Sequence, residues 1–265
     1  MALIVGGAAA IAVGLIYVIR RRSRAEYFFV EVERGAGTFA FIGTAYAVLL
    51  AFVVLEAFQS FNDAKTGAEE EAISIVQLSR TAEFFPPAQR DPIEAVLICY
   101  GQAVIHQEWP AMMHGERSPI VQGWVTRLEG SLHQLRPDTP ARQGAFLQLL
   151  EQEDKRTDAR RARLSEANRA LPAPVWFILG LGAFVTIGFA MFFADRRELF
   201  IVQASLIGAI AALVVSGLLL IWFLDHPYEN RNGSIKPDEM ERQLVIVRAE
   251  QVSAPQLCDG EGRPL

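Results

Sequence analysis

The sequence predicts an all-α, four-span helical membrane protein with an extramembrane four-helix bundle between spans two and three. Hydrophobic residues make up 51% of the 265 residues and charged residues 21%, and they occur in separate blocks. Four runs are almost free of charge, and each approaches the ~20 residues that a helix needs to cross a bilayer. Between the second and third runs, helix-start signals recur, and apolar residues follow them at helical spacing.

These blocks divide the chain into spans, loops and a bundle. The expected ranges are 1–20 for the first span, 21–36 for a short cytoplasmic loop, 37–58 for the second span, 59–172 for the extramembrane bundle, 173–194 for the third span, 195–198 for a second short cytoplasmic loop, 199–224 for the fourth span and 225–265 for a polar tail. The end of this tail is expected to be largely disordered.

Two other interpretations of the apolar runs are less consistent with the residues. Four buried core helices in one small soluble protein would need an unusual number of charge-free runs. A signal peptide carries its positive charges before the apolar core, whereas here Arg20, Arg21, Arg22 and Arg24 follow it. The first run is therefore expected to be a membrane anchor.

The arginines also predict the orientation in the membrane. Short cytoplasmic loops collect Lys and Arg because positive charge resists translocation. The first loop contains Arg21, Arg22, Arg24 and Arg34, directly after Arg20, and the second contains Arg196 and Arg197. We therefore expect both loops in the cytoplasm, the protein in the plasma (inner) membrane, and the bundle in the periplasm or outside the cell.

Pairs of a capping residue and a proline predict where the bundle helices begin. These pairs are Asp91-Pro92, Ser118-Pro119 and Thr139-Pro140. No helix breaker separates Thr38 from Phe85, so the second span is expected to continue into the bundle as one helix. Segment 141–171 is expected to lead into the third span, interrupted only by prolines, and no β-sheet is expected.

The stretch VIHQEWPAMMHGE, residues 104–116, contains the residue types of a metal or catalytic site. His106 and Glu108 are two residues apart and lie on different helix faces, so they cannot chelate a metal as an i,i+4 pair does. We expect Pro110 to end the helix before Trp109 and Trp109 to pack the turn or to contact lipid headgroups. Glu108 is expected to accept hydrogen bonds from arginines of a neighbouring helix.

The arginine-rich segment RRARLSEANR, residues 160–169, is expected to form a solvated helix face. The alternative is that Arg160 or Arg163 pairs with Glu71 across the bundle.

The remaining chemistry is sparse. GxSxG, HExxH, CxxC and Gly-rich phosphate-loop motifs do not occur, so no catalytic, cofactor or metal site and no enzyme activity are predicted. The net charge of −5 provides no basic footprint, so nucleic acid is not an expected partner. Cys99 and Cys258 both fall in segments expected outside; two free thiols are the expectation and a disulfide is the alternative.

The spans have no charged residue at their centres, which disfavours proton pumps and voltage sensors. Three spans instead contain small residues spaced four apart, which let helix backbones approach closely in lipid. These rows are Gly6, Ala10 and Gly14; Gly43, Ala47 and Ala51; and Ala204, Gly208 and Ala212. They predict dense packing within or between subunits, and a homo-oligomer.

Several separated motifs resemble one family. They are YAVLLAFVV in the second span, EWP at residues 108–110 with a glycine and a serine following, RRARL ahead of LPAPVW, and LDHPYENRNGSIKP after the fourth span. From these motifs the chain resembles the bacterial four-span family called the bestrophin-like domain, over about residues 40–247. The recurring positions of that family are matched here by Tyr46, Glu71, Tyr100, Glu108, Trp109, Arg163, Trp176 and Asp225, and the resemblance brings no established chemical role for them.

The resemblance implies kinship with bestrophins, which are pentameric anion channels whose helices continue from the membrane into a helical domain. The long helix expected from Thr38 onward is similar to that design. Bestrophins keep the helical domain in the cytosol, whereas the arginines here predict it outside. No bestrophin pore residue or calcium site is carried over to this chain.

The first functional hypothesis is a homo-oligomeric ion channel, with inorganic ions and the lipid bilayer as partners. Spans without charge can line a pore that is gated by a hydrophobic constriction. On the second span, the expected pore-lining residues are Tyr46, Phe52, Leu55, Glu56 and Phe58. The alternative is a membrane-anchored sensor or scaffold whose outer bundle binds a ligand or partner, and which needs a partner protein to reach the cytosol.

Overall fold

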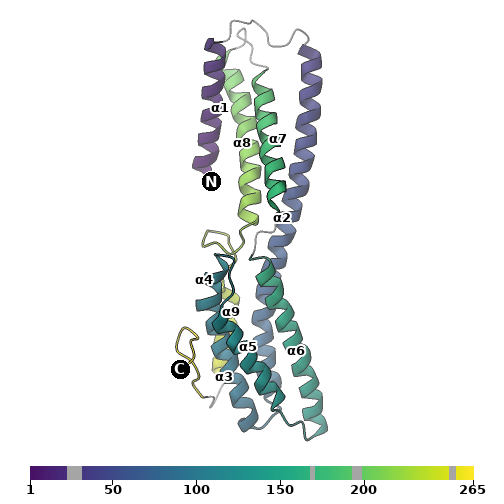
Figure 1. The fold of residues 1–265 in the computed structure, drawn as a ribbon, viewed down its shortest axis with the longest axis vertical. Coiled ribbons are helices and arrows are strands. Elements are labelled where there is room, and N and C mark those ends of the chain that lie inside the picture. The colour runs from purple at the N-terminus through teal and green to yellow at the C-terminus, as the bar shows by residue number, and fades with distance from the viewer. Residues whose placement is uncertain (23–31, 168–170, 193–198, 251–254) are drawn as a thin grey trace. The chain divides into compact units, whose positions relative to one another are not determined.

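The structure, a computed structural model, describes residues 1–22, 32–167, 171–192, 199–250 and 255–265 (Figure 1). Its helices are α1 (Ala2–Arg22), α2 (Val32–Ala82), α3 (Pro87–Ala103), the π-helical turn η1 (Val104–Glu108), α4 (Trp109–Met112), α5 (Pro119–His133), α6 (Pro140–Ser165), α7 (Ala173–Met191), α8 (Phe200–Leu224) and α9 (Asp238–Glu250). In the described residues the only β-type pairing is an isolated bridge between Cys258 and Pro264. The all-α prediction is confirmed.

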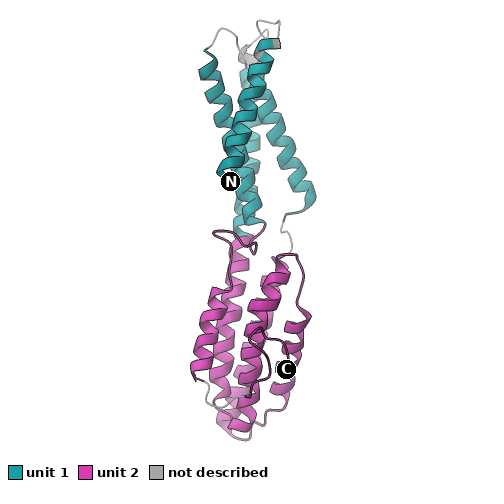
Figure 2. Ribbon diagram, turned by 90° about the vertical axis from the view of Figure 1, so that its left-hand side faces the viewer, with its two compact units in different colours: residues 1–59, 170–225 teal, residues 60–169, 226–265 magenta. Residues whose placement is uncertain are grey.

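The chain forms two compact units (Figure 2). Unit 1 contains Met1–Gln59 and Ala170–Asp225, and unit 2 contains Ser60–Arg169 and His226–Leu265. Helix α2 is one unbroken helix of 51 residues that contributes to both units, as the lack of a helix breaker predicted.

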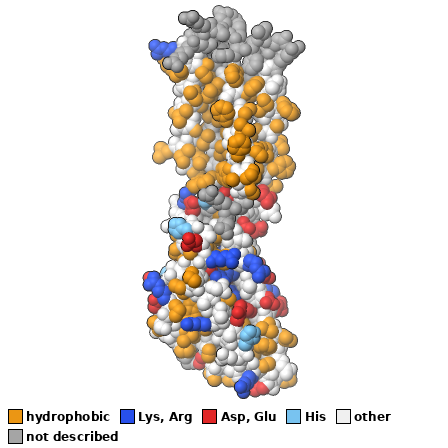
Figure 3. Space-filling model, in the orientation of Figure 1, with side chains coloured by type: hydrophobic (Ala, Val, Ile, Leu, Met, Phe, Trp, Pro, Cys, Tyr) orange, Lys and Arg blue, Asp and Glu red, His pale blue; other side chains and the backbone are white. Residues whose placement is uncertain are grey.

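Unit 1 consists of the four apolar helices. Helices α1, α7, α8 and part of α2 are each long and apolar enough to span a bilayer, which confirms the four predicted spans. Hydrophobic side chains cover the visible surface of this unit in Figure 3. Phe41, Phe184 and Leu213 expose about three-quarters of their surface. Such surfaces are stable in lipid and not in water, so the chain is a membrane protein.

The close helix approaches in unit 1 occur at two glycines outside the predicted rows. A Cβ atom on Gly182 would lie 2.3 Å from the ring of Tyr46, and one on Gly217 would lie 2.7 Å from Leu50. In the predicted rows, a Cβ on Gly6 or Gly43 would meet no described atom within 4 Å. These two rows therefore do not mediate packing within the described chain.

Arg24, Arg196 and Arg197 lie outside the described residues. Helix α8 ends at Leu224, the residue at which the fourth span was expected to end, and Asp225 is its C-cap.

Unit 2 is a helical bundle with a continuous apolar core. The second part of α2, together with α3, α5 and α6, supplies most of the buried side chains, and α9 adds Met240, Leu244 and Val247. The predicted apolar stripe of α5 is buried at Val121, Trp124 and Leu128. The bundle therefore includes a helix, α9, that the sequence had assigned to the polar tail.

The predicted helix starts are confirmed for α5 and α6 and wrong for α3. Helices α5 and α6 begin at Pro119 and Pro140, and the Thr139 hydroxyl accepts a hydrogen bond from the Arg142 N–H. Helix α3 begins at Pro87, and Pro92 lies inside it. Pro87 provides an earlier first-turn proline, which explains the earlier start. Pro92 is the sixth residue of the helix, where it lacks the N–H that would pair with the Ala88 carbonyl.

Two expectations about the tail are wrong. Cys99 and Cys258 form a disulfide, with their Cα atoms 5.8 Å apart, and are not free thiols. Residues 255–265 are ordered as part of unit 2: the Trp124 indole, for example, donates a hydrogen bond to the Gly262 carbonyl at 2.7 Å. Residues 251–254 lie outside the described chain. Spacing alone could not reveal the pair, because 159 residues separate the two cysteines.

Candidate functional site

A buried charged cluster lies at the centre of unit 2. Four of the residues that match the family pattern meet there, and none of them has exposed surface: Glu71, Tyr100, Glu108 and Arg163. Arg163 donates to Glu71 from Nε at 2.5 Å and from Nη2 at 3.0 Å, and its Nη2 also donates to Glu108 at 2.6 Å. The Tyr100 hydroxyl donates to Glu71 at 2.5 Å.

Two further arginines of α6 complete the cluster. Arg160 donates to the Glu108 carboxylate at 2.6 and 3.2 Å. Arg156 donates to the Tyr100 hydroxyl at 2.8 Å and to Glu153 at 2.7 Å. Three arginines therefore face three carboxylates, those of Glu71, Glu108 and Glu153, so the cluster carries no net formal charge. Balanced and hydrogen-bonded pairs are the form in which charges are tolerated in an interior.

The expected solvated face of residues 160–169 is therefore wrong for its buried arginines. The alternative ion pair between Arg163 and Glu71 is confirmed, and Glu108 accepts from arginines of α6 as expected. Arg156, Arg160 and Arg163 are spaced four and three residues apart, so they share one face of α6. That spacing was available in the sequence and would have revealed Arg156, which the sequence reading missed.

Gly67 lets α2 and α6, which both contribute to the cluster, approach closely. A Cβ atom on Gly67 of α2 would lie 3.0 Å from the Ala159 carbonyl oxygen and 3.0 Å from the Arg163 nitrogen of α6. Gly67 is one helical turn before Glu71, so both lie on the same face of α2. The close backbone contact at Gly67 therefore brings the Glu71 carboxylate within reach of Arg163.

The surroundings favour the ionised forms of Glu108 and Arg163. Burial raises the pKa of Glu108, but the charges of Arg163 and Arg160 outweigh burial and the net pKa is lowered. Burial lowers the pKa of Arg163, and Glu71 and Glu108 more than offset this. Burial, followed by the charge of Glu71, raises the pKa of Tyr100. The three carboxylates are each bonded to an arginine of α6, so the cluster is suited to hold α2, α3, η1 and α6 together.

Trp109 lies at the edge of this cluster, in helical geometry. The Arg163 guanidinium carbon lies 5.4 Å from its ring centroid, and the Tyr228 ring packs edge-on at 5.5 Å. The expectation that Pro110 forces Trp109 out of the helix is wrong. The preceding turn, η1, is π-helical, and this wider turn accommodates a proline that cannot donate to the usual carbonyl.

Two further family-pattern residues, Trp176 and Asp225, meet in unit 1. Asp225 accepts a hydrogen bond from the Leu171 N–H at 2.9 Å and one from the Trp176 indole at 3.3 Å. These bonds fix the start of α7 against the end of α8.

The structure separates the five predicted pore-lining residues. Phe52 is exposed, and Leu55 and Glu56, three and four residues after it, are exposed on the same face of α2. Phe58 is exposed beside them. Tyr46 lies on another face: it is buried, and its hydroxyl donates to the Leu179 carbonyl at 3.2 Å.

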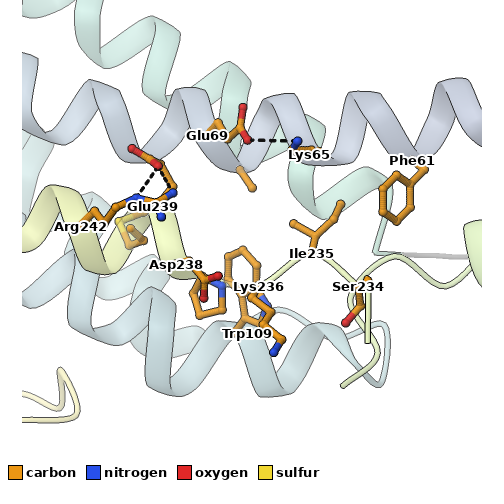
Figure 4. Close-up of a pocket in the computed structure, with 14 residues that line it drawn as sticks. Phe61, Lys65, Glu69, Trp109, Ser234, Ile235, Lys236, Asp238, Glu239 and Arg242 are labelled. Carbon is orange, nitrogen blue, oxygen red and sulfur yellow. Dashed lines mark hydrogen bonds and ion pairs between the residues drawn. The ribbon is translucent and has the colours of Figure 1, made fainter. Parts of the chain in front are cut away.

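A separate cavity of about 370 Å³ opens in unit 2 between α2 and the start of α9 (Figure 4). Trp109 lies across it from Lys65 and Glu69, which pair at 3.7 Å. Glu239 and Arg242 form a second ion pair on its rim.

The histidines of residues 104–116 do not join a metal site in the described structure. Across the described ranges, no three or more His, Cys, Asp or Glu side chains are grouped so that they could hold a metal ion.

Comparisons with known proteins agree with this architecture. No curated protein matches the sequence. A bacterial bestrophin homolog from Klebsiella pneumoniae aligns with a TM-score of 0.68 at 15% identity, covering 93% of this chain and 97% of that one. A structure described as a membrane protein aligns with a TM-score of 0.68 at 15% identity, covering 96% and 98%. At this identity, these likenesses establish the fold alone.

The family is established by the sequence itself. A family model described as "Bestrophin-like domain" matches residues 6–238, which include all four spans and most of unit 2. The chain therefore belongs to the bestrophin-like domain family.

Proposed function

We propose that this protein is a homo-oligomeric channel for inorganic ions, with a hydrophobic gate formed by α2. The observation that carries the proposal is the exposed row Phe52, Leu55 and Glu56 on a charge-free span of a bestrophin-like chain. Repeated around a symmetric ring, two apolar side chains would form a constriction that excludes water, and Glu56 would form a charged mouth. Phe58 would extend this wall.

In the proposed channel, Tyr46 does not line the pore but joins two spans. Its ring packs on Gly182, and its hydroxyl is bonded to α7 within the same protomer. It therefore holds α2 against α7, so that the opposite face of α2 is presented to neighbouring subunits or to the pore.

Liposome flux and planar-bilayer recordings test the channel. Leu55→Ser and Phe52→Ser would hydrate the constriction, so we expect each variant to raise the open fraction at least several-fold. Phe184→Ser on α7, which is equally apolar and exposed, is the matched control and should leave the current unchanged. Glu56→Gln should shift the reversal potential in a salt gradient. Absence of current from the wild type and from every variant would contradict the proposal.

We also infer that unit 2 lies outside the cytosol. The arginine-bearing loops support this orientation through the positive-inside rule. The disulfide between Cys99 and Cys258 supports it independently, because disulfides persist in oxidising compartments. Leu147→Cys in unit 2 should react with an impermeant maleimide added to intact spheroplasts, and Arg21→Cys should react only after permeabilisation. The reverse pattern would place the bundle in the cytosol.

A second candidate is a membrane-anchored sensor or scaffold, and the cavity beside Trp109 favours it. Its volume of about 370 Å³ falls within the range of small-molecule sites, and an aromatic wall with charged residues on the rim suits a small polar ligand. A sensor also needs a cytosolic partner. Stable co-purification of a cytosolic subunit, together with an inactive channel assay, would favour this function over the first.

A further inference from the structure

The C-terminal segment 255–265 of unit 2 is closed by hydrogen bonds within itself. The Asp259 and Leu265 N–H groups donate to the Arg263 and Leu257 carbonyls at 2.9 and 3.1 Å. The Asp259 carboxylate accepts from the Glu261 and Arg263 N–H groups at 2.9 and 2.8 Å. These bonds close the segment into a tight turn, and the disulfide from Cys258 to Cys99 attaches it to α3. We call residues 255–265 the strap.

The strap docks where α3 changes into η1. Gln102 and Gln107 donate to the Gly260 and Glu261 carbonyls, both at 3.3 Å. The Trp124 indole of α5 donates to the Gly262 carbonyl at 2.7 Å. Gln102 precedes η1 by two residues and Gln107 lies within it, so the strap bridges the transition.

Gly262 makes the closest contact. Its φ angle is +76°, and a Cβ atom there would lie 2.2 Å from the Ala103 nitrogen, the last residue of α3. Only glycine fits both this conformation and this distance. On the other side of the helix end, a Cβ on Gly101 would lie 2.7 Å from Leu244 of α9. The last turn of α3 is therefore held between α9 and the strap.

The turn that follows determines where Glu108 points. Every residue after a π-helical turn is rotated by about one residue, roughly 100°, relative to a continuous α-helix. Glu108 ends η1, and its fully buried carboxylate faces Arg160 and Arg163. Loss of the π-helical turn would rotate this carboxylate out of the charged cluster.

We propose that the strap is a disulfide-locked clamp that maintains the π-helical turn η1 and thereby holds Glu108 in the charged cluster. The clamp lies beyond residue 238, outside the segment that matches the family, and does not depend on the proposed channel activity. Reduction by a dithiol transfers two electrons and two protons to the Cys99–Cys258 bond, gives two thiols and converts the reagent into its own disulfide. Only hydrogen bonds and packing then retain the strap.

Hydrogen exchange of the full-length protein in detergent, measured by mass spectrometry, tests the clamp. Reduction with dithiothreitol should raise the exchange rates of residues 255–265 and of residues 104–109 by about tenfold. Peptides from the first half of α6 should be unchanged. The Cys258→Ser variant should show the raised rates without reductant and no further change with it.

Two glycine variants distinguish the effect of strap docking from the effect of the disulfide. Gly262→Ala retains both cysteines but drives a methyl group into Ala103, so it should loosen residues 104–109 in the oxidised protein. Gly260→Ala meets no described atom within 4 Å and should leave exchange unchanged.

Two outcomes would overturn the proposal. If the freed strap exchanges rapidly while residues 104–109 remain protected, the strap does not maintain the turn. If Gly262→Ala raises exchange uniformly throughout unit 2, the strap contributes only general stability.

Discussion

Arg163 of α6 donates hydrogen bonds to both carboxylate oxygens of Glu71 on α2, 92 residues earlier in the chain, and both side chains are fully buried. A pair of this kind is balanced only as long as both partners are present. Removing one leaves an uncompensated charge in the interior.

Arg163→Ala should therefore destabilise unit 2 strongly. It leaves Glu71 without its ion-pair partner and removes one of the two arginines at Glu108, so we expect a loss of about 3–5 kcal/mol of unfolding free energy. Arg161→Ala is the control, because Arg161 is exposed and its ion pair with Asp158 lies on the surface. Thermal unfolding in one detergent measures both; equal stabilities would contradict the assignment of the cluster as a structural junction.

The lowered pKa of Glu108 predicts an acid-dependent loss of stability. Its ionised form is favoured in the folded state, so its contribution is present above the unfolded-state pKa of about 4.3 and is lost as the pH falls through the lower folded-state pKa. The stability difference between the wild type and Glu108→Gln should be large at pH 7 and shrink below about pH 4.3. Unfolding curves from pH 7 to pH 3 test this. The exposed control Glu129→Gln should differ little from the wild type throughout.

Glu94 predicts a pH dependence of the opposite sign. Burial raises its pKa, Arg90 at 3.4 Å opposes this, and the charges of Asp91, Glu83 and Glu250 add to the increase. Its Oε2 has no hydrogen-bond partner in the described chain. Because the pKa is raised in the folded state, Glu94 adds to the free energy of unfolding below its unfolded-state pKa, and this contribution is lost as the pH rises through the folded-state pKa.

Glu94→Gln should accordingly raise the melting temperature by a few degrees at pH 7–8. The gain should disappear below about pH 4.3, where the wild-type carboxyl is protonated as well. Melting curves at the two pH values are sufficient. A lower melting temperature at neutral pH would show that the carboxylate is stabilising.

Gly182 predicts a packing effect within the membrane spans. A methyl group at this position would overlap the Tyr46 ring, so Gly182→Ala should cost about 1–3 kcal/mol and loosen α2 from α7. Gly180→Ala, two residues away, meets no described atom within 4 Å and should be neutral or slightly stabilising, because Ala favours the helix. Melting temperatures of the two variants in the same detergent should differ; identical values would exclude close α2–α7 packing.

The sequence by itself determined the local structure. Runs without charge identified four spans, an unbroken stretch from Thr38 to Phe85 identified the long helix, and cap-proline pairs identified the starts of α5 and α6. These features depend on transfer into lipid and on hydrogen bonds between near neighbours, so a short window contains all the residues involved.

Only the tertiary structure decided which distant residues meet. Arg163 was expected on a solvated face, yet it reaches Glu71 because Gly67 lets α2 and α6 approach. Cys99 reaches Cys258 across 159 residues, and Tyr46 turns inward because Gly182 leaves room for its ring. Each contact depends on the relative placement of helices that are far apart in the chain, and local propensity contains no information about that placement.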